Sequence, residues 1–187
     1  MTTRTWENLQ IPAAGTYVLD AAHTRVGFLV KHMMVSKVRG HFGEFAGTVT
    51  IAENPLDSSA EITIKAESIT TGAPDRDNHL RGDDFLGADK FPDLTFRSTR
   101  VLGHSGDEFT LAGDLTIRDV TKPVELTVEY GGAGTNPWGQ TLWGFSLTGE
   151  IDREEFGLTW NQALETGGVL VGKKIKIEIE GEANPAA

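Results

Sequence analysis

Residues 109–130 read FTLAGDLTIRDVTKPVELTVEY, and apolar residues occupy every second position on either side of a short central break. A period of two is typical of strands with one buried and one exposed face, because successive strand side chains point to opposite faces of a sheet. The break, residues 119–122, is long enough only for a short connection. The stretch therefore predicts two neighbouring antiparallel strands that bury the same side.

The same alternation recurs along the whole chain. It predicts eight strands, over residues 25–32, 44–51, 61–66, 94–99, 109–118, 124–130, 143–151 and 174–180. Only residues 75–86 and 160–166 favour a helix, so no set of helices is available to cover eight half-buried strands. Long open edges invite aggregation and closure removes them. We therefore expect an all-β, eight-stranded antiparallel β-barrel with one or two short helices at its mouth.

Length and composition fit one globular domain. The chain has 187 residues, of which 39% are apolar and 24% are charged, and this balance supports a sizeable core. We expect a barrel domain over residues 15–187 after an N-terminal extension, residues 1–14. The first 16 residues lack the apolar run of a secretory signal, which predicts a cytoplasmic protein. The absence of cysteine excludes disulfides and thiolate metal sites.

The net charge of −10 argues against nucleic acid as a partner, because an acidic surface repels phosphate backbones. The same charge argues against binding to an anionic membrane surface unless a local basic patch reverses the field. No apolar run is long enough for stable membrane insertion. The one locally basic stretch in the N-terminal half is KHMMVSKVR, residues 31–39. We interpret it as a solvated loop.

The loops should sort by barrel end if neighbouring strands alternate in direction. One end receives residues 33–43, 68–92, 119–122 and 153–170, and the other receives residues 52–59, 102–107 and 131–140. The first set is longer and carries both helical stretches. Because binding usually involves long loops at one end of a rigid scaffold, we place the mouth there.

Three strands carry a glycine in the middle of the apolar face, at Gly47, Gly113 and Gly149. Glycine allows a barrel strand to bend. A missing side chain can also leave room inside, and an eight-stranded barrel is just wide enough for one small ligand. The sequence leaves both interpretations open.

Four blocks of sequence resemble the YceI-like family in order and spacing. They are DAAHTRVGFLVKHMMVSKVRGHFGEFAGTV (Asp20–Val49), RDNHLRGDDFLGADKFPDLTF (Arg76–Phe96), LTIRDVTKPVEL (Leu115–Leu126) and DREEFGL (Asp152–Leu158). The resemblance implies a lipocalin-like barrel that carries or sequesters a long-chain isoprenoid or similar amphiphilic lipid, with no cofactor and no catalysis. It also favours ligand space over the glycines. Asp119 departs from the family, where glycine is common, and many relatives carry a signal peptide.

We expect the lipid to be bound by inward-facing strand residues and by loop residues at the mouth. The predicted ligand-binding residues are Phe28, Val30, His32, Phe42, Phe45, Leu80, Phe85, Phe96, Leu115, Phe145, Arg153 and Trp160. His32 and Arg153 would hold the head group, since a guanidinium donates charge-assisted hydrogen bonds to phosphate or carbonyl oxygens. Core packing is the alternative for the apolar residues, and an ion pair with Asp119 or Asp152 is the alternative for Arg153.

Two other functions remain open. His23, His32 and His41 are spaced nine residues apart, and with nearby carboxylates they suggest a metal-dependent or other small-molecule enzyme if the fold brings them together. No nucleophile elbow or phosphate-binding loop supports catalysis. A stress-response module that binds another protein is the other alternative, and a homodimer is possible.

Overall fold

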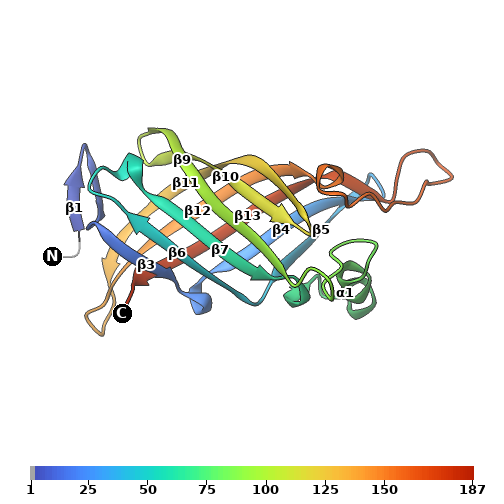
Figure 1. Ribbon diagram of the computed structural model, residues 1–187, viewed down its shortest axis with the longest axis horizontal. Coiled ribbons are helices and arrows are strands. Elements are labelled where there is room, and N and C mark those ends of the chain that lie inside the picture. Colours follow the sequence, from blue (N-terminus) through green and yellow to red (C-terminus); the bar gives the residue numbers. More distant parts are fainter. Residues whose placement is uncertain (1–2) are drawn as a thin grey trace.

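The computed structural model of the protein describes residues 3–187, which form a closed antiparallel barrel (Figure 1). Eight strands pair in a ring in the order β3, β6, β7, β9, β10, β11, β12 and β13, and β13 closes the ring on β3. Their bounds are Gly15–Leu19, Phe45–Ile51, Ser59–Lys65, Asp93–Ser105, Glu108–Ile117, Val120–Thr135, Thr141–Asp152 and Val171–Pro185. The predicted eight-stranded barrel is therefore confirmed.

Three of the barrel strands are interrupted. Strand β3 continues into β4 (Arg25–His32) after the short 3-10 turn η1 (Ala21–His23), and β13 pairs with both. Strand β5 (Ser36–Phe42) leads into β6, and β7 leads through η3 (Ala66–Ser68) into β8 (Ile69–Thr70), which pairs with β5.

Strand β5 corrects the prediction of a loop over residues 33–43. In its sequence, SKVRGHF, the exposed Lys37 and Arg39 alternate with Val38, Gly40 and Phe42, but the glycine supplies no apolar side chain in the middle of that face. Its pairing with β4 along the whole length makes it a strand. The tertiary partner therefore outweighs a weak local pattern.

The helical predictions are half right. Helix α1 (Pro74–Arg81) begins one residue before the predicted range 75–86 and ends five residues before its end. Residues 160–166 are not helical, because Ala163 bridges Val169 and the Asn161 side chain exchanges two hydrogen bonds with the backbone of Val171, at 2.8 and 3.1 Å. Two further 3-10 turns are η2 (Pro55–Asp57) and η4 (Arg153–Phe156). No helix within residues 3–187 has the length and apolar character needed to cross a bilayer.

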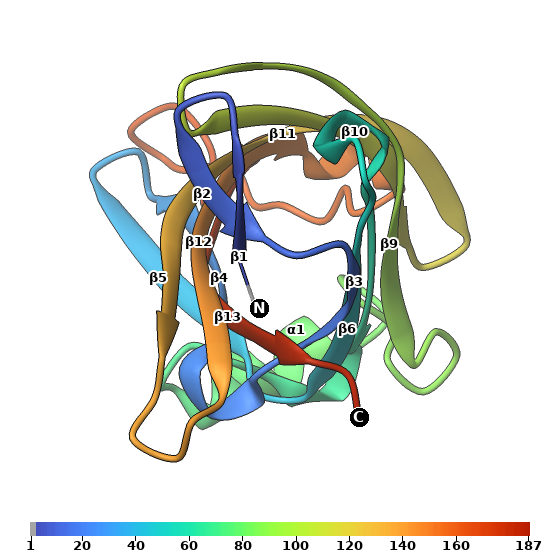
Figure 2. The same ribbon diagram turned by 90° about the vertical axis from the view of Figure 1, so that its left-hand side faces the viewer.

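Most of the extension preceding the barrel forms a hairpin of its own. Strands β1 (Thr3–Trp6) and β2 (Leu9–Pro12) make a separate two-stranded sheet at the end of the barrel where both termini lie (Figure 2). The Arg4 guanidinium donates to the carbonyls of Glu53 and Ala52, each at 2.5 Å. The Tyr130 hydroxyl donates to the Gln10 carbonyl at 2.6 Å. These bonds tie the hairpin to the barrel.

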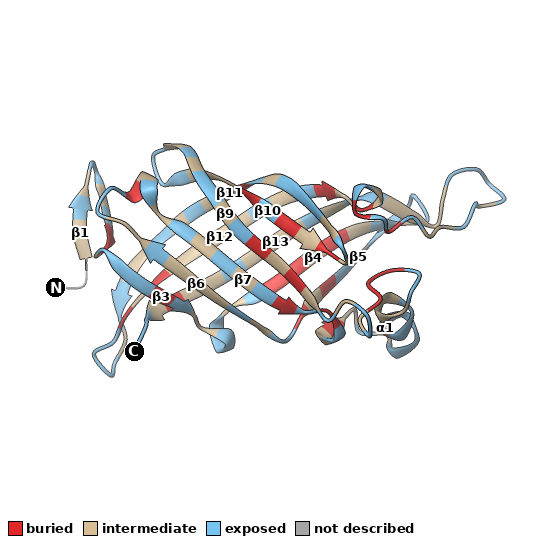
Figure 3. Ribbon diagram, in the orientation of Figure 1, coloured by how far each residue is buried: buried red, intermediate tan, exposed pale blue. Residues whose placement is uncertain are grey.

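The core is concentrated toward the α1 end of the barrel (Figure 3). Its buried residues are Val26, Phe42, Ile64, Ala66, Ile69, Phe85, Leu86, Leu94, Phe96, Leu115, Ile117, Leu126, Ile151, Phe156 and Leu158. Phe156, from η4, is only 1% exposed. A smaller cluster of Tyr17, Trp143 and Ala183 lies toward the hairpin end. The long loops therefore fold inward and close the α1 end.

Candidate functional site

An apolar cavity of about 190 Å³ lies inside the half of the barrel that is nearer the β1–β2 hairpin. The last residues of β6, the first of β7 and the first of β12 contribute to its wall, together with Ile11 and Pro12 of β2. Five aromatic residues line it: Phe96, Phe109, Tyr130, Trp143 and Phe145. Aliphatic residues from all eight barrel strands complete the wall: Leu19, Val49, Ile62, Val101, Leu111, Val128, Leu147 and Ile179 are among them.

The cavity wall has almost no electrostatic character. Glu61 is the only charged residue among those that line it, and its carboxylate lies 3.4 Å from the exposed Arg97 guanidinium. Burial raises the pKa of Tyr130 to about 12, and its hydroxyl is already bonded to Gln10. The wall can therefore take up hydrocarbon, and its two titratable side chains both interact with partners outside the cavity.

Strand alternation explains the composition of this wall. Trp143, Phe145 and Leu147 occupy alternate positions of β12, and Val128 and Tyr130 do the same on the neighbouring strand β11. Inward-facing residues of a barrel follow this period of two. The cavity is larger than the roughly 150 Å³ that holds a benzene molecule and smaller than the roughly 300 Å³ lower bound of common ligand pockets.

The three mid-strand glycines do not open this space. A side chain at Gly47 would meet Leu19 at 2.5 Å, one at Gly113 would meet Phe96 at 2.4 Å, and one at Gly149 would meet Leu126 at 2.4 Å. Side chains from neighbouring strands therefore already occupy the room above the glycines. The expectation of ligand space there is wrong, while a register irregularity next to Gly113 fits the bending interpretation.

The cavity lies at the opposite end from the predicted mouth. Of the twelve predicted ligand-binding residues, Phe96 and Phe145 line it. Ten lie elsewhere: Phe42, Phe85, Leu115 and Arg153 are buried, Phe28, Phe45, Leu80 and Trp160 pack against the core, and Val30 and His32 are half-buried on β4. Loop residues at the predicted mouth, such as Phe85 and Leu158, are part of the core. The set of lipid-binding residues stays a prediction.

Arg153 holds the polypeptide backbone together at the α1 end. It is 3% exposed, and its guanidinium donates to the carbonyls of Leu158 (2.6 Å), Trp160 (2.9 Å), Gly172 (2.9 Å) and Val171 (3.3 Å). Within residues 3–187 it forms no salt bridge, so the expected ion pair with Asp119 or Asp152 is absent. Burial lowers the pKa of Arg153. Four of its five N–H donors are bonded to backbone carbonyls, so the guanidinium serves the backbone rather than a lipid head group.

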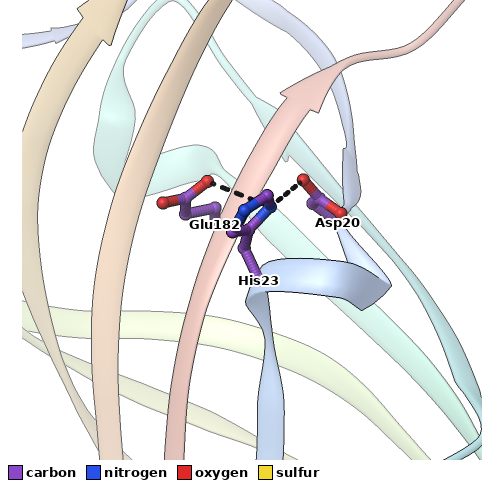
Figure 4. A group of neighbouring side chains, drawn as sticks. All are labelled: Asp20, His23 and Glu182. Atoms are coloured by element: carbon purple, nitrogen blue, oxygen red, sulfur yellow. Dashed lines mark hydrogen bonds and ion pairs between the residues drawn. The ribbon is translucent and has the colours of Figure 1, made fainter. Parts of the chain in front are cut away.

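One histidine on the outside of the barrel lies between two carboxylates (Figure 4). Nδ1 of His23 is 2.8 Å from Oδ2 of Asp20 and 3.8 Å from Oε2 of Glu182. Among residues 3–187 this is the only group of three side chains that could ligate a metal, and His32 and His41 are not part of it. The fold therefore does not bring the three evenly spaced histidines together.

Hydrogen bonding within this group accounts for its geometry. Oδ1 of Asp20 accepts from the Ala22 backbone at 2.9 Å and so caps η1. The hydrogen bond between Asp20 and His23 raises the pKa of the imidazole and lowers the pKa of the carboxyl group. The arrangement is an ion pair that joins the β3–β4 break to β13. Sequence reasoning missed Glu182 because it lies 159 positions from His23.

Comparisons with known proteins agree with this architecture. Residues 17–183 match the YceI-like domain family, so the β1–β2 hairpin lies outside the matched region. A UPF0312 protein of Staphylococcus aureus (strain USA300) is 41% identical over 168 residues, which are 89% of this chain and 95% of the relative.

Solved structures give the same result. A Campylobacter jejuni YCEI protein has a TM-score of 0.72 at 33% identity, covering 84% of this chain and 90% of its own. Burkholderia cenocepacia BcnA has a TM-score of 0.77 at 22% identity, and the match covers 88% of this chain and 98% of BcnA. A polyisoprenoid binding domain from Saccharophagus degradans shares the fold at 12% identity. Its TM-score is 0.67, and the match covers 93% of this chain and 100% of that domain. With its barrel topology and a match over nearly its whole length, this chain belongs to the YceI-like family.

Proposed function

We propose that this protein binds the hydrocarbon part of an isoprenoid or similar long-chain lipid in the apolar cavity, and that it carries or sequesters this lipid. The observation that supports the proposal is the uncharged wall with five aromatic residues around about 190 Å³. The name of the Saccharophagus degradans domain, which describes polyisoprenoid binding, points to the same ligand class.

The energetics favour a chain end over a compact polar ligand. Burial of apolar surface contributes roughly 25 cal/mol per Å², while ordering of the chain and association take back much of it. A cavity of about 190 Å³ is only slightly larger than the roughly 150 Å³ cavity that binds one benzene molecule, so it holds only the terminal part of a long chain. The rest of the chain has to pass the β1–β2 hairpin, because Ile11 and Pro12 line the cavity at that end.

The wall also favours binding over catalysis. Catalytic sites need groups that exchange protons, act as nucleophiles or bind metals. Among the described residues that line the cavity, Tyr130 and Glu61 are the only titratable ones, and both have partners elsewhere. We therefore assign the cavity to ligand binding.

Filling the cavity tests this proposal. Val128 lines the wall and is half-buried, so Val128→Trp should occupy the space and weaken binding of geranylgeraniol about tenfold or more, since a ligand and an indole cannot share it. Titration followed by tryptophan fluorescence gives the affinity, and mass spectrometry of solvent extracts identifies any lipid that purifies with the protein.

Val128→Leu is the matched control, because it keeps the wall apolar and adds little volume. We expect its affinity to stay within about twofold of the wild type. Failure of the wild-type protein to bind geranylgeraniol, or equal binding by the Val128→Trp variant, would contradict the proposal.

A further inference from the structure

The turn between β4 and β5 has an unusual combination of backbone and side chains. Met33 and Met34 occupy its two central positions with φ of 52° and 65°, and the Val35 N–H donates to the His32 carbonyl at 3.2 Å. Turns with two central residues at positive φ strongly favour Asn-Gly, because a side chain is strained in that region. Two methionines there are unfavourable for the turn itself.

The turn presents apolar side chains to solvent. Met33 is 44% exposed, Met34 is 61% exposed and Val35 is 85% exposed. The segment that precedes β13 supports them: the Met33 N–H donates to the Leu170 carbonyl at 2.8 Å, and the Met34 side chain lies against Gly168. Arg153 in turn bonds to the carbonyls of Leu158 and Trp160 in this segment and to those of the first two residues of β13. The three exposed apolar residues therefore lie on a supported turn, and Figure 1 shows that the β4–β5 turn is at the α1 end of the barrel.

Positive charge surrounds the same turn. Lys31 and Lys37 lie directly opposite each other on β4 and β5, and like charges in this position repel. Lys174 lies in the irregular part of β13 that faces Lys31, and its register partner on β12 is Asp152. All three are exposed, and within residues 3–187 none of them forms a salt bridge. Residues 31–42 contain no acidic residue, although the whole chain carries −10.

These features lie together, and each is unfavourable for the isolated protein. We define the basic tip as Met33, Met34 and Val35 with Lys31, Lys37 and Lys174. We propose that the basic tip attaches the protein peripherally to an anionic lipid bilayer: the apolar side chains enter the interface and the lysines contact lipid head groups.

A bilayer fits the basic tip better than a protein partner does. Its three apolar side chains are exposed and methionine side chains are flexible, so the tip suits a soft surface that adapts to it. The net negative charge does not prevent contact, because screening limits electrostatic interactions to about 10 Å at moderate salt. Contact through the tip leaves the hairpin end of the barrel facing water. The inference does not depend on what the cavity holds.

Co-sedimentation with vesicles tests the inference. We expect the wild-type protein to sediment with vesicles made from equal parts of phosphatidylcholine and phosphatidylglycerol, but not with phosphatidylcholine alone. Lys31→Gln and Lys37→Gln should each weaken this partition about fivefold. Added salt should weaken it as well, because the contact is electrostatic.

The variant with Met33→Asn and Met34→Gly separates attachment from folding. It installs the residues that this turn geometry prefers, so we expect the Tm to rise by about 2–4 °C. It removes both methionine side chains, so partition onto the anionic vesicles should fall about tenfold.

Trp138→Ser is the control for a general loss of surface hydrophobicity. Trp138 is 82% exposed on the turn between β11 and β12, at the other end of the barrel, and its replacement should leave partition unchanged. The proposal is overturned if the wild-type protein ignores anionic vesicles, if the double-methionine variant sediments like the wild type, or if Trp138→Ser is the variant that loses binding.

Discussion

Arg153 illustrates how a buried charge can serve the backbone instead of a ligand. A guanidinium in a core normally needs a carboxylate, because an uncompensated buried charge is strongly unfavourable. Here four backbone carbonyls take the place of the carboxylate, those of Leu158, Trp160, Val171 and Gly172. The centre of the Phe85 ring lies 5.9 Å from the guanidinium carbon. Arg153 therefore fixes the long segment between η4 and β13 against the α1 end of the core.

Removal of this side chain should be costly. Arg153→Met removes four hydrogen bonds and leaves the carbonyls of Leu158, Trp160 and Gly172 without the guanidinium donor, while the Val171 carbonyl keeps its bond from Asn161. We therefore expect the free energy of unfolding to fall by about 3 kcal/mol or more. Urea unfolding measures the loss, and limited proteolysis should reveal earlier cleavage between residues 157 and 170. Arg153→Lys should restore only part of the stability, since an ammonium cannot match the fork of a guanidinium. A loss below about 1 kcal/mol would show that the four bonds are dispensable.

The His23–Asp20 pair makes a prediction about pH. The pKa of His23 lies above its usual 6.5, so the stability this group contributes is full below pH 6.5 and is lost as the pH rises through the raised pKa. The pKa of Asp20 lies below 3.8, so its contribution is present above pH 3.8 and is lost as the pH falls through the lowered pKa. The pair therefore contributes its full stability between pH 3.8 and pH 6.5, where Asp20 is ionised and His23 is protonated.

NMR titration of the imidazole checks this prediction. In the wild type His23 should titrate above 6.5, and Asp20→Asn should return its pKa toward that value, because the Asp20 hydrogen bond is the main cause of the shift. Glu182→Gln should have a smaller effect, since Glu182 is 3.8 Å away and Asp20 is 2.8 Å away. A wild-type pKa at or below 6.5 would be inconsistent with the observed geometry.

At the scale of elements, the β1–β2 hairpin stands out because it pairs with no barrel strand. Ile11 is 4% exposed and lines the cavity, while Arg4 holds the hairpin to the loop that follows β6. The hairpin thus covers the cavity end with few bonds. An element held in this way can open locally at a lower free energy than the barrel itself.

Loosening the hairpin should therefore speed ligand exchange. Arg4→Ala removes the two bonds to the Glu53 and Ala52 carbonyls without altering the cavity wall, and we expect geranylgeraniol to dissociate severalfold faster. Stopped-flow displacement followed by tryptophan fluorescence measures the rate. Arg39→Ala is the control, since its guanidinium is exposed, pairs with Glu178 and lies on β5, and neither residue lines the cavity. Equal dissociation rates for the Arg4→Ala variant and the wild type would argue against a covering role.

On the scale of the whole molecule, the barrel has two different ends. The α1 end is closed by loop side chains and carries the basic tip, whereas the hairpin end contains the cavity. The interior of an eight-stranded barrel can either be filled by side chains or hold one small ligand, so the side chains that enter each end decide which of the two occurs there. The expected homodimer remains a prediction that a size measurement at several concentrations would test.

Alternation along the chain was sufficient to predict eight strands and a closed barrel, because a half-buried strand needs a period of two regardless of its partners. The location of the cavity followed from contacts that no local pattern contains. Phe85 and Phe156 fold inward from loops, and Leu126 and Phe96 fill the space above Gly149 and Gly113. Such contacts join positions far apart in sequence, so only the assembled barrel establishes which end is filled and which is hollow.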